Sequence, residues 1–290
     1  MQNPGLSGNC IALILDWWVH DLDPYIVRIL GRFGVRWYGV AYLLGLILGV
    51  WLLDRWRRAD RLPLKKNELT DFAISLFLGI MIGGRLGFCF FYAPHMTFTN
   101  PLFVFKVWHG GMSSHGGMVG LAVACVWFAR SRGLNALVLA DAVGAVAAIG
   151  VIAGRIANFI NGELWGRPTK VPWAVIFPRA PLVDGKMVPR HPSQLYAAAL
   201  EGVLVLTVAL SVHRRHRRPG LTLGVVLCVY SLARFVDEFW RAPADGTLYF
   251  GWMSKGQLLT IPVVLVGAWL LFRSLSRPPD PEAYSLKEES

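Results

Sequence analysis

The sequence predicts an all-α integral membrane protein with about seven transmembrane helices. Of its 290 residues, 54% are hydrophobic and only 16% are charged, whereas about a quarter of the residues of a soluble domain are charged. The chain also has twelve tryptophans, and amphipathic aromatic side chains collect at the membrane–water interfaces. A soluble class is therefore not favoured, and the +11 net charge does not point to nucleic acid as a partner.

Seven apolar segments account for the predicted spans, because a helix needs about 20 mostly apolar residues to cross a bilayer. The third segment is short, and its start overlaps the stretch HGGMSSHGGMVG at 109–120, so some of the helices are expected to be tilted or re-entrant. The segments are 37–53, 71–92, 115–129, 136–154, 193–212, 221–239 and 256–273.

The distribution of Lys and Arg sets the expected orientation. Fifteen of the 29 lie in the short loops after the first, third and fifth segments and in the tail after the seventh. Eleven lie on the other side, several of them in the long 156–192 connection. Since cytoplasmic loops carry the excess of Lys and Arg, we expect the N-terminus outside, the tail 274–290 in the cytoplasm and a periplasmic segment around 156–192.

The whole chain, 1–290, is expected to be a single membrane-embedded domain with an outer-face segment at 1–36. Within that segment, CIALILDWWVH (10–20) follows no Lys or Arg and is interrupted by Asp16, so it does not fit a signal peptide and fits an interfacial segment instead. The four cysteines show no metal-ligand spacing, and three of them lie in apolar segments as expected of small core residues. We expect no metal and no cofactor.

Two polar stripes cross the predicted spans, although a charged side chain within a membrane costs about 2.5–3.5 kcal/mol on insertion scales and usually marks function. In GRIANFINGELWG, Arg155, Asn158 and Gly162 share a helical face with Glu163 next to it. A second face in VYSLARFVDEFWRAP carries residues at i, i+4, i+8 and i+11, which are Tyr230, Arg234, Glu238 and Arg241. Arginine presents a fixed fork of donors that suits a phosphate, so the stripes indicate an anion site.

A structural interpretation competes with the functional one, since buried arginines and acids also pair to hold helices together. It is a serious alternative for Arg85 in IGGRLG and for Asp141 in the fourth span. It is weaker for Arg155 and Arg234, because a pair that only packed helices would not need asparagine, glycine and tyrosine on the same faces.

The two histidines of HGGMSSHGGMVG differ in their prospects. His109 follows Trp108 in an aromatic-rich loop and is expected at the interface. His115 opens an apolar helix after two serines, so it is either a helix-start residue or a group that handles a proton, for which histidine is best suited near neutral pH. A third histidine, His191 in RHPSQLY, is equally compatible with a rigid loop-to-helix junction and a ligand contact.

These motifs resemble the bacterial phosphatidylglycerol–prolipoprotein diacylglyceryl transferases over about residues 23–273. GRIANFINGELWG is similar to the signature of that family, G-R-x-x-N-F-x-N-x-E-x-x-G. Five further blocks look like family blocks in the family order: WYG in the first span, GGRLG, SHGGMVG, RHPSQLY and YSLARFVDEFWR.

The resemblance implies a multi-pass enzyme of the bacterial cytoplasmic (inner) membrane, with seven helices and the orientation expected above. It implies transfer of the diacylglyceryl group of phosphatidylglycerol to the lipobox cysteine thiol in the signal peptide of a prolipoprotein. Glycerol phosphate is released in this first step of bacterial lipoprotein maturation. The implied partners are phosphatidylglycerol, prolipoproteins and the lipid bilayer, without nucleic acid.

The resemblance also assigns residues. The essential arginines of the family fall on Arg155 and Arg234, and its proposed catalytic histidine falls on His115. Two positions depart from the family pattern, because His109 and Ala197 stand where relatives commonly have acidic residues. Other functionally sensitive positions fall on Tyr38, Asn158, Glu163, Gly166 and Tyr230.

The chemistry suits these residues, because the nucleophile is the thiol of the partner and the leaving phosphate attracts arginine. We hypothesise that Arg155 and Arg234 hold the lipid phosphate, that His115 takes the thiol proton, and that other residues position the arginines. The positioning residues are Glu163, Glu238 and Asn158. In the alternative to a role for His115, the positive field of the arginines alone activates the thiol.

A transporter or flippase for an anionic lipid is the competing class of protein. Such proteins often show inverted repeats, and none is evident in this sequence.

Overall fold

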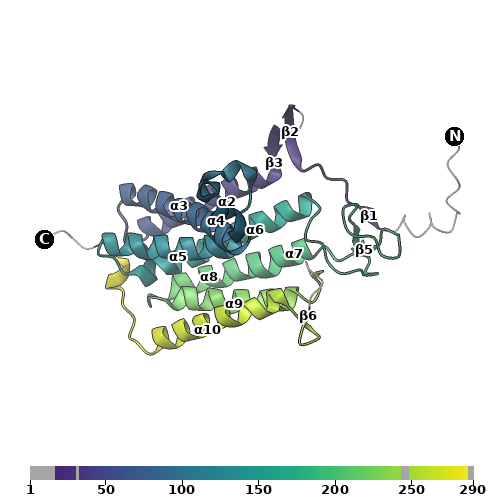
Figure 1. The fold of residues 1–290 in the computed structure, drawn as a ribbon. Helices are drawn as coiled ribbons and strands as arrows, with labels where there is room; N and C mark the ends of the chain where they lie inside the picture. Colours follow the sequence, from purple (N-terminus) through teal and green to yellow (C-terminus); the bar gives the residue numbers. More distant parts are fainter. Residues whose placement is uncertain (1–16, 31–32, 243–247, 287–290) are drawn as a thin grey trace, which may run out of the picture. The chain divides into compact units, whose positions relative to one another are not determined.

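The structure, a computed structural model, describes residues 17–30, 33–242 and 248–286 and is predominantly helical (Figure 1). Within these ranges, five helical segments are long and apolar enough to cross a membrane, which confirms the all-α membrane class. They are α2 (Trp37–Arg58), α3 (Lys66–Phe91), α6 (Ala136–Ile160), the continuous Ser193–Arg215 segment and α10 (Lys255–Leu275). Two further helices, α5 (Ser114–Ser131) and α9 (Leu221–Asp237), coincide with the third and sixth predicted segments.

The Ser193–Arg215 segment is not a regular α-helix. It begins as α7 (Ser193–Ala197), continues as the π-helix η3 (Ala198–Leu204) and ends as α8 (Val205–Arg215). π-Helical turns inside α-helices are uncommon and are frequent at functional sites. Short helical elements occur elsewhere in the chain, namely α4 (Pro94–Thr99), η1 (Pro101–Phe105), η2 (Val107–His109) and η4 (Glu282–Tyr284).

Small β-sheets, which the sequence did not predict, lie outside the helices. A three-stranded sheet joins β1 (Trp18–Val19), β4 (Val175–Ile176) and β5 (Pro189–Arg190), with β1 parallel and β5 antiparallel to β4. It therefore ties the start of the chain to the connection that follows α6. Two hairpins complete the set: β2 (Tyr25–Leu30) with β3 (Phe33–Arg36), and β6 (Leu248–Tyr249) with β7 (Met253–Ser254).

The predicted terminal segments are covered only in part. Residues 1–16 of the expected outer-face segment, including most of CIALILDWWVH, lie outside the described residues, as do residues 287–290 of the expected tail. Three of the cysteines are described and are free; Cys89 and Cys125 are buried, as predicted for small core residues, and Cys228 is half-buried.

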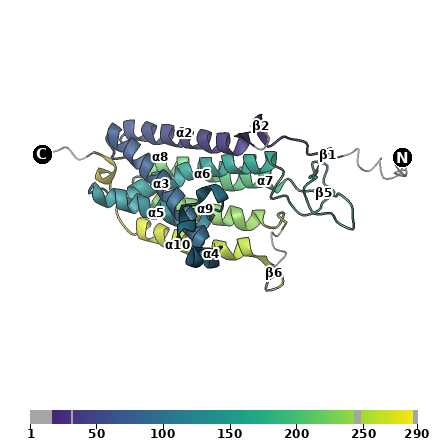
Figure 2. The ribbon, with the colours of Figure 1, turned by 45° about the horizontal axis from the view of Figure 1, so that its top comes forward.

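The chain divides into two compact units. Unit 1 comprises Met1–Gly49, Ala147–Leu210 and Gly224–Trp269, and unit 2 comprises Val50–Val146, Ser211–Leu223 and Leu270–Ser290. In unit 1, the first part of α2 lies beside the second part of α6 in both ribbon views (Figures 1 and 2). A Cβ atom on Gly45 of α2 would lie 3.6 Å from the Cβ of Ala153 in α6.

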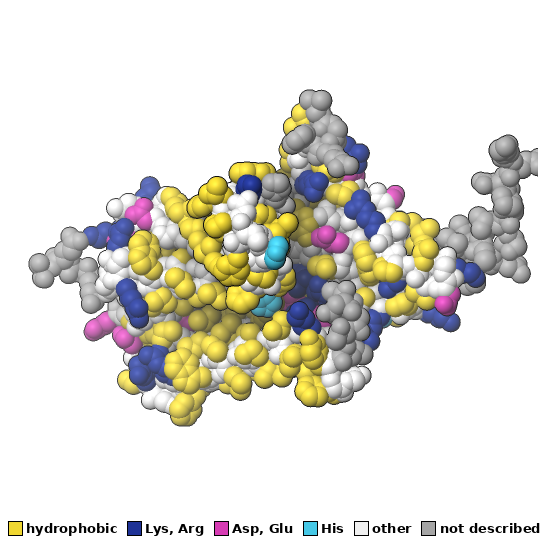
Figure 3. Space-filling view, viewed as in Figure 1, with side chains coloured by type: hydrophobic (Ala, Val, Ile, Leu, Met, Phe, Trp, Pro, Cys, Tyr) yellow, Lys and Arg dark blue, Asp and Glu magenta, His cyan; other side chains and the backbone are white. Residues whose placement is uncertain are grey.

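Large apolar side chains remain exposed along the long helices, as a lipid environment requires. On α10, the side chains of Leu265 and Phe272 are 64% and 74% exposed. Figure 3 shows such apolar side chains gathered over this helix. In water, a contiguous apolar surface of this kind is rare, so the exposure agrees with the membrane class.

Asp141 and Arg85, the two charges that the sequence analysis set apart from the polar stripes, are buried and have structural partners in unit 2. Asp141 is fully buried and accepts hydrogen bonds from the backbone N–H groups of Gly220 (2.9 Å) and Leu223 (2.7 Å) and from the Tyr284 hydroxyl (3.0 Å). Arg85 pairs with no carboxylate in the described residues. Instead its guanidinium donates to the backbone carbonyl oxygens of Phe103, Val104, Lys106, Gly110 and Gly111. Within the described residues, neither side chain takes part in the arginine–acid pairing that the structural interpretation proposed; backbone groups are the main partners of both.

Glycines allow α3 and α5 to pack closely in unit 2. Gly79 and Gly83 of α3 face Gly116 and Gly120 of α5, and a Cβ atom on Gly83 would lie only 2.4 Å from the carbonyl oxygen of Gly116. Small residues let membrane helices approach backbone to backbone. This contact therefore fixes the N-terminal end of α5, where His115 lies.

Replacement of Gly83 by alanine is expected to force α3 and α5 apart. The free energy of unfolding in detergent micelles should fall by about 1–3 kcal/mol, the usual cost of overpacking. Gly150 in α6 is the matched control, because a Cβ atom there meets nothing within 4 Å and alanine is the better helix former. Equal stability of G83A and G150A would contradict the close contact.

Candidate functional site

A buried carboxylate joins the two predicted arginines in unit 1. Glu201 of η3 is fully buried, and its Oε2 accepts from Nη2 (2.6 Å) and Nε (3.2 Å) of Arg155 in α6. Its Oε1 accepts from Nη1 of Arg234 in α9 at 3.1 Å. The two polar stripes predicted from the sequence therefore converge on a third helix segment that sequence reasoning did not include.

Local packing explains why η3 reaches α6. Gly202 follows Glu201, and a Cβ atom there would lie 2.4 Å from Cγ1 of Ile152. Any side chain larger than hydrogen would push η3 away from α6 and draw Glu201 from Arg155. A signal for Glu201 was present in the sequence, since it is the only acidic residue of the apolar segment 193–212.

A second set of acids surrounds Arg234, and Glu238, one helical turn further along the chain, is one of them. Nη2 of Arg234 forms an ion pair with Oε1 of Glu238, whose Oε2 accepts from the Ser254 hydroxyl at 2.6 Å. Nε of Arg241 lies 3.9 Å from the same Glu238 carboxylate. Asp237, which is fully buried, lies 3.6 Å from Nη1 of Arg234. Arg234 is thus held from both sides of its guanidinium.

Arg155, Arg234 and Arg241 lie close together around the carboxylates of Glu201 and Glu238 and form the arginine cluster. Burial, followed by the positive charges of Arg234 and Arg155, lowers the pKa of Arg241 to about 10. Arg155 uses Nε and Nη2 for Glu201, and in the described part of the chain no partner contacts its Nη1. A planar donor fork with a free N–H suits an incoming phosphate.

Tyr38, Asn158 and Glu163 form a separate hydrogen-bonded group. The Tyr38 hydroxyl donates to Oε1 of Glu163, and Nδ2 of Asn158 donates to the Tyr38 hydroxyl and, at 2.7 Å, to Oε1 of Glu163. The expectation that Asn158 and Glu163 position the arginines directly is therefore wrong. They hold the Tyr38 hydroxyl instead, because the chain turns out of the helix after Ile160 and carries Glu163 toward α2.

The turn after α6 has special backbone geometry and is supported by the RHPSQLY segment. Gly162 and Leu164 both have positive φ, 61° and 55°, which glycine adopts readily and leucine does not. The Gln194 side chain donates to the Glu163 carbonyl (2.6 Å), and the Ser193 hydroxyl donates to the Leu164 carbonyl (3.0 Å). RHPSQLY thus acts as the rigid junction that one interpretation of His191 predicted.

His191 itself is held in an aromatic group. Burial lowers its pKa, so its ring is neutral at neutral pH and can accept a hydrogen bond. Nδ1 lies 3.2 Å from the Tyr196 hydroxyl, which accepts from Nε1 of Trp173 at 2.6 Å.

Gly166 is a backbone crossing point. Its N–H donates to the His191 carbonyl oxygen (2.9 Å), and it pairs with Arg241 in a β-bridge. A Cβ atom on Gly166 would lie 2.5 Å from the His191 carbonyl oxygen and 2.8 Å from that of Trp240. The glycine of the signature therefore permits a close approach that brings Arg241 to the cluster. Tyr230, which was predicted on the same face as Arg234, is half-buried one turn earlier on α9.

His115 belongs to unit 2 and is the second residue of α5. Its side chain is exposed, and no hydrogen bond or ion pair to it occurs within the described ranges. Ser113 caps the helix, since its hydroxyl accepts from the Gly116 N–H at 3.1 Å. His109 ends η2, and its side chain is outside the described part. Within the described residues, no group of three or more His, Cys, Asp or Glu could hold a metal ion.

His20 supports the same turn and was not singled out from the sequence. It is buried, and its Nε2 lies 2.7 Å from the carbonyl oxygen of Phe159, near the C-terminal end of α6. Because a carbonyl can only accept, Nε2 carries the hydrogen and donates. A Cβ atom on Gly162 would lie 3.1 Å from the His20 ring. No motif marks His20, because its role depends on β1 pairing with β4.

A match to a known family agrees with this geometry. Residues 24–273 match the family model described as prolipoprotein diacylglyceryl transferase. Proteins named phosphatidylglycerol–prolipoprotein diacylglyceryl transferase are similar to the chain along most of its length. That of Aeromonas hydrophila is 42% identical over 263 residues, which cover 90% of this chain and 94% of the relative.

Two other relatives with the same name give comparable figures. The protein of Pseudomonas entomophila is 43% identical over 268 residues, covering 91% of this chain and 97% of the relative. That of Agrobacterium fabrum is 41% identical over 267 residues, covering 88% and 93%. The apolar helices and the names of the relatives are those of a multi-pass membrane transferase. The chain belongs to the prolipoprotein diacylglyceryl transferase family, which confirms the resemblance seen in the sequence.

Replacement of His20 by phenylalanine keeps an aromatic ring under Gly162 but removes the donor to Phe159. We expect faster backbone hydrogen exchange in peptides that cover 157–166, because Gly162 N–H also bonds to the Phe159 carbonyl (2.9 Å), and a loss of about 1 kcal/mol of stability. The control H20Q can restore a donor and should exchange nearly as slowly as the unaltered protein. Equal exchange in all three would refute the support of the turn by His20.

Proposed function

We propose that this chain transfers the diacylglyceryl group of phosphatidylglycerol to the lipobox cysteine of prolipoprotein signal peptides. The names of the relatives support the reaction. The single observation that carries it is the Arg155–Glu201–Arg234 cluster, where two guanidinium groups share one buried carboxylate. A fixed pair of guanidinium groups is suited to bind the phosphodiester of an anionic lipid.

The step can be written with atoms balanced. The thiolate sulfur of the lipobox cysteine attacks the carbon of the diacylglyceryl group that carries the phosphate oxygen, forming the thioether S–C bond while the C–O bond breaks. The electron pair of that bond leaves with glycerol phosphate, which gains negative charge, and the thiol proton passes to a base. Groups placed where charge develops accelerate a reaction more than groups that stabilise the substrate and the transition state equally.

Roles follow for the chain's own residues. Arg155 and Arg234 bind the phosphate and stabilise the leaving group, and Glu201 and Glu238 hold the two guanidinium groups in position. Tyr38 of α2, Asn158 of α6 and Glu163 of the turn after α6 contribute polar groups to substrate binding. Gly166 and Tyr230 are the remaining substrate-binding residues. His115 takes the thiol proton. A field of positive charge can also lower a thiol pKa, and that is the alternative to His115.

The expected topology is part of this proposal. All seven long helices cross the cytoplasmic membrane of a bacterium, with the N-terminus outside, residues 156–192 in the periplasm and the tail in the cytoplasm. Both units then belong to one membrane-embedded transferase domain. The five apolar helices support a multi-pass protein, and the excess of Lys and Arg in alternate loops supports the orientation.

The experiment incubates purified protein with phosphatidylglycerol and a lipobox peptide. Release of glycerol phosphate together with a thioether-linked lipidated peptide is expected. R155A and R234A should lose at least about a hundredfold in rate, since each removes a charged donor to the phosphate. R58Q is the control, because Arg58 makes an exposed ion pair with Asp54, and such pairs contribute little.

Three outcomes decide between the alternatives. Near-normal transfer by H115Q, with R155A and R234A inactive, would remove His115 as the base and leave the arginine field. Normal transfer by R155A and R234A would overturn the phosphate site. Lipid movement across the bilayer without a covalent product would favour a transporter instead, which is the alternative that the names of the relatives do not support.

A further inference from the structure

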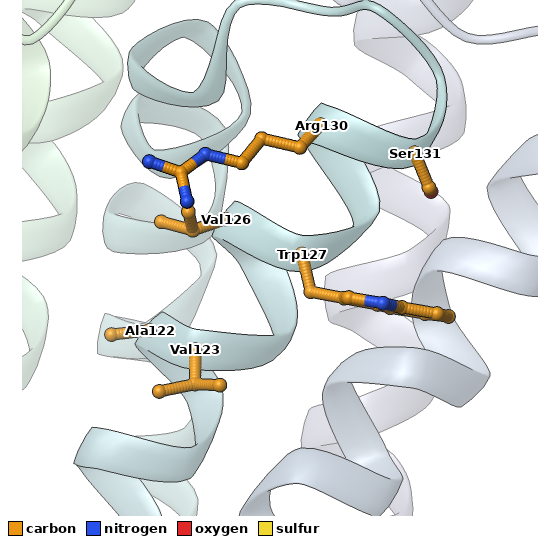
Figure 4. Close-up of a pocket in the computed structure, with 6 residues that line it drawn as sticks. All are labelled: Ala122, Val123, Val126, Trp127, Arg130 and Ser131. Atoms are coloured by element: carbon orange, nitrogen blue, oxygen red, sulfur yellow. The ribbon is translucent and has the colours of Figure 1, made fainter.

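One face of α5 forms a shallow depression at its C-terminal half. The face is apolar except at its end, and it is drawn in Figure 4. Val123 and Trp127 are both 62% exposed on it. In Figure 4 the Arg130 side chain folds back over Val126, whereas the Trp127 ring extends to the other side of the face. The lining residues are Ala122, Val123, Val126, Trp127, Arg130 and Ser131.

Two arginines at this end of α5 differ in their partners. Arg132 is neutralised by two acids of α3, since its Nη1 lies 3.0 Å from Glu68 and its Nη2 lies 3.0 Å from Asp71. Arg130 is exposed, and no acid in the described part of the chain pairs with it. Within the described residues, the apolar face therefore ends in a positive charge that no acid compensates. The two acids of α3, Glu68 and Asp71, already pair with Arg132.

The dimensions of α5 match one bilayer. Its 18 residues extend about 27 Å at 1.5 Å per residue, close to the roughly 30 Å of the hydrocarbon core. Arg130 is the penultimate residue and His115 the second, so they lie about 22 Å apart along the helix. A helix that crosses the membrane with Arg130 and Trp127 near one end presents a cation and an amphipathic aromatic at the headgroup level.

We propose that this face binds an anionic phospholipid of the cytoplasmic leaflet, separate from the lipid that is the substrate. The phosphate lies against Arg130, and an acyl chain follows Val126 and Val123 along α5. The charge of Arg130 and the apolar length of the face together favour a lipid with a negative headgroup over a zwitterionic one. The assignment to the cytoplasmic leaflet rests on the proposed function and its seven-span topology.

The test uses Trp127 as a local reporter in reconstituted bilayers of phosphatidylcholine. Brominated phosphatidylglycerol or brominated phosphatidylcholine is titrated in, and the quenching of Trp127 is obtained as the difference between the unaltered protein and W127F. No lipobox peptide is present, so the result does not depend on transfer. Phosphatidylglycerol should bind this face about fivefold more tightly than phosphatidylcholine, the preference expected from one basic residue near the surface.

R130Q should reduce the preference to about one, and R132Q should leave it near fivefold because Arg132 is already paired. Three results would overturn the proposal: equal quenching by both lipids in the unaltered protein, a loss of preference in R132Q as large as in R130Q, or no quenching by either lipid. The last would mean that a second copy of the chain covers this face. Failure of the transfer assay with an intact fivefold preference would overturn only the proposed function.

Discussion

The candidate site depends on the fully buried carboxylate of Glu201. One oxygen binds Arg155 at 2.6 Å and the other binds Arg234 at 3.1 Å. Without that negative charge, two guanidinium groups would face each other in a poorly solvated interior, where like charges repel strongly. Breaking a buried pair costs about 3–5 kcal/mol because the remaining charge is left uncompensated. Glu201 thus lets α6 and α9 present two cations to one place.

The groups around this carboxylate have distinct physical tasks. Glu238 and Ser254 fix Arg234 from the side opposite Glu201, and Gly256 allows that approach, since a Cβ atom there would lie 2.5 Å from the Glu238 carboxyl group. Tyr38, Asn158 and Glu163 are held by hydrogen bonds among their own side chains.

Much of this arrangement could be predicted from the sequence, because the dominant signals are local. Apolar length marked the helices, and helical periodicity placed Arg155 with Asn158, and Arg234 with Glu238, on common faces. The partners across helices could not be predicted in this way. Glu201 pairs with residues 46 and 33 positions away, and it stands alone in an apolar segment without a polar stripe.

Two further features depended on backbone geometry that the sequence pattern does not encode. The contact of Glu163 with Tyr38 follows from the positive-φ turn after α6, whereas helical periodicity would have kept Glu163 near the arginine face. The role of His20 follows from a two-residue strand pairing across more than 150 residues. Short strands of this kind leave no periodic signal, since alternation needs at least about four residues to be visible.

The link that Glu201 makes between the two arginines is tested most directly by the rate of diacylglyceryl transfer by E201Q, compared with E68Q as the control. Glutamine keeps the shape of Glu201 but removes the charge that joins the two arginines, so kcat/KM should fall about a hundredfold or more. Glu68 pairs with Arg132 at the surface, and E68Q should change kcat/KM by less than about threefold. Near-normal transfer by a folded E201Q protein would contradict the account.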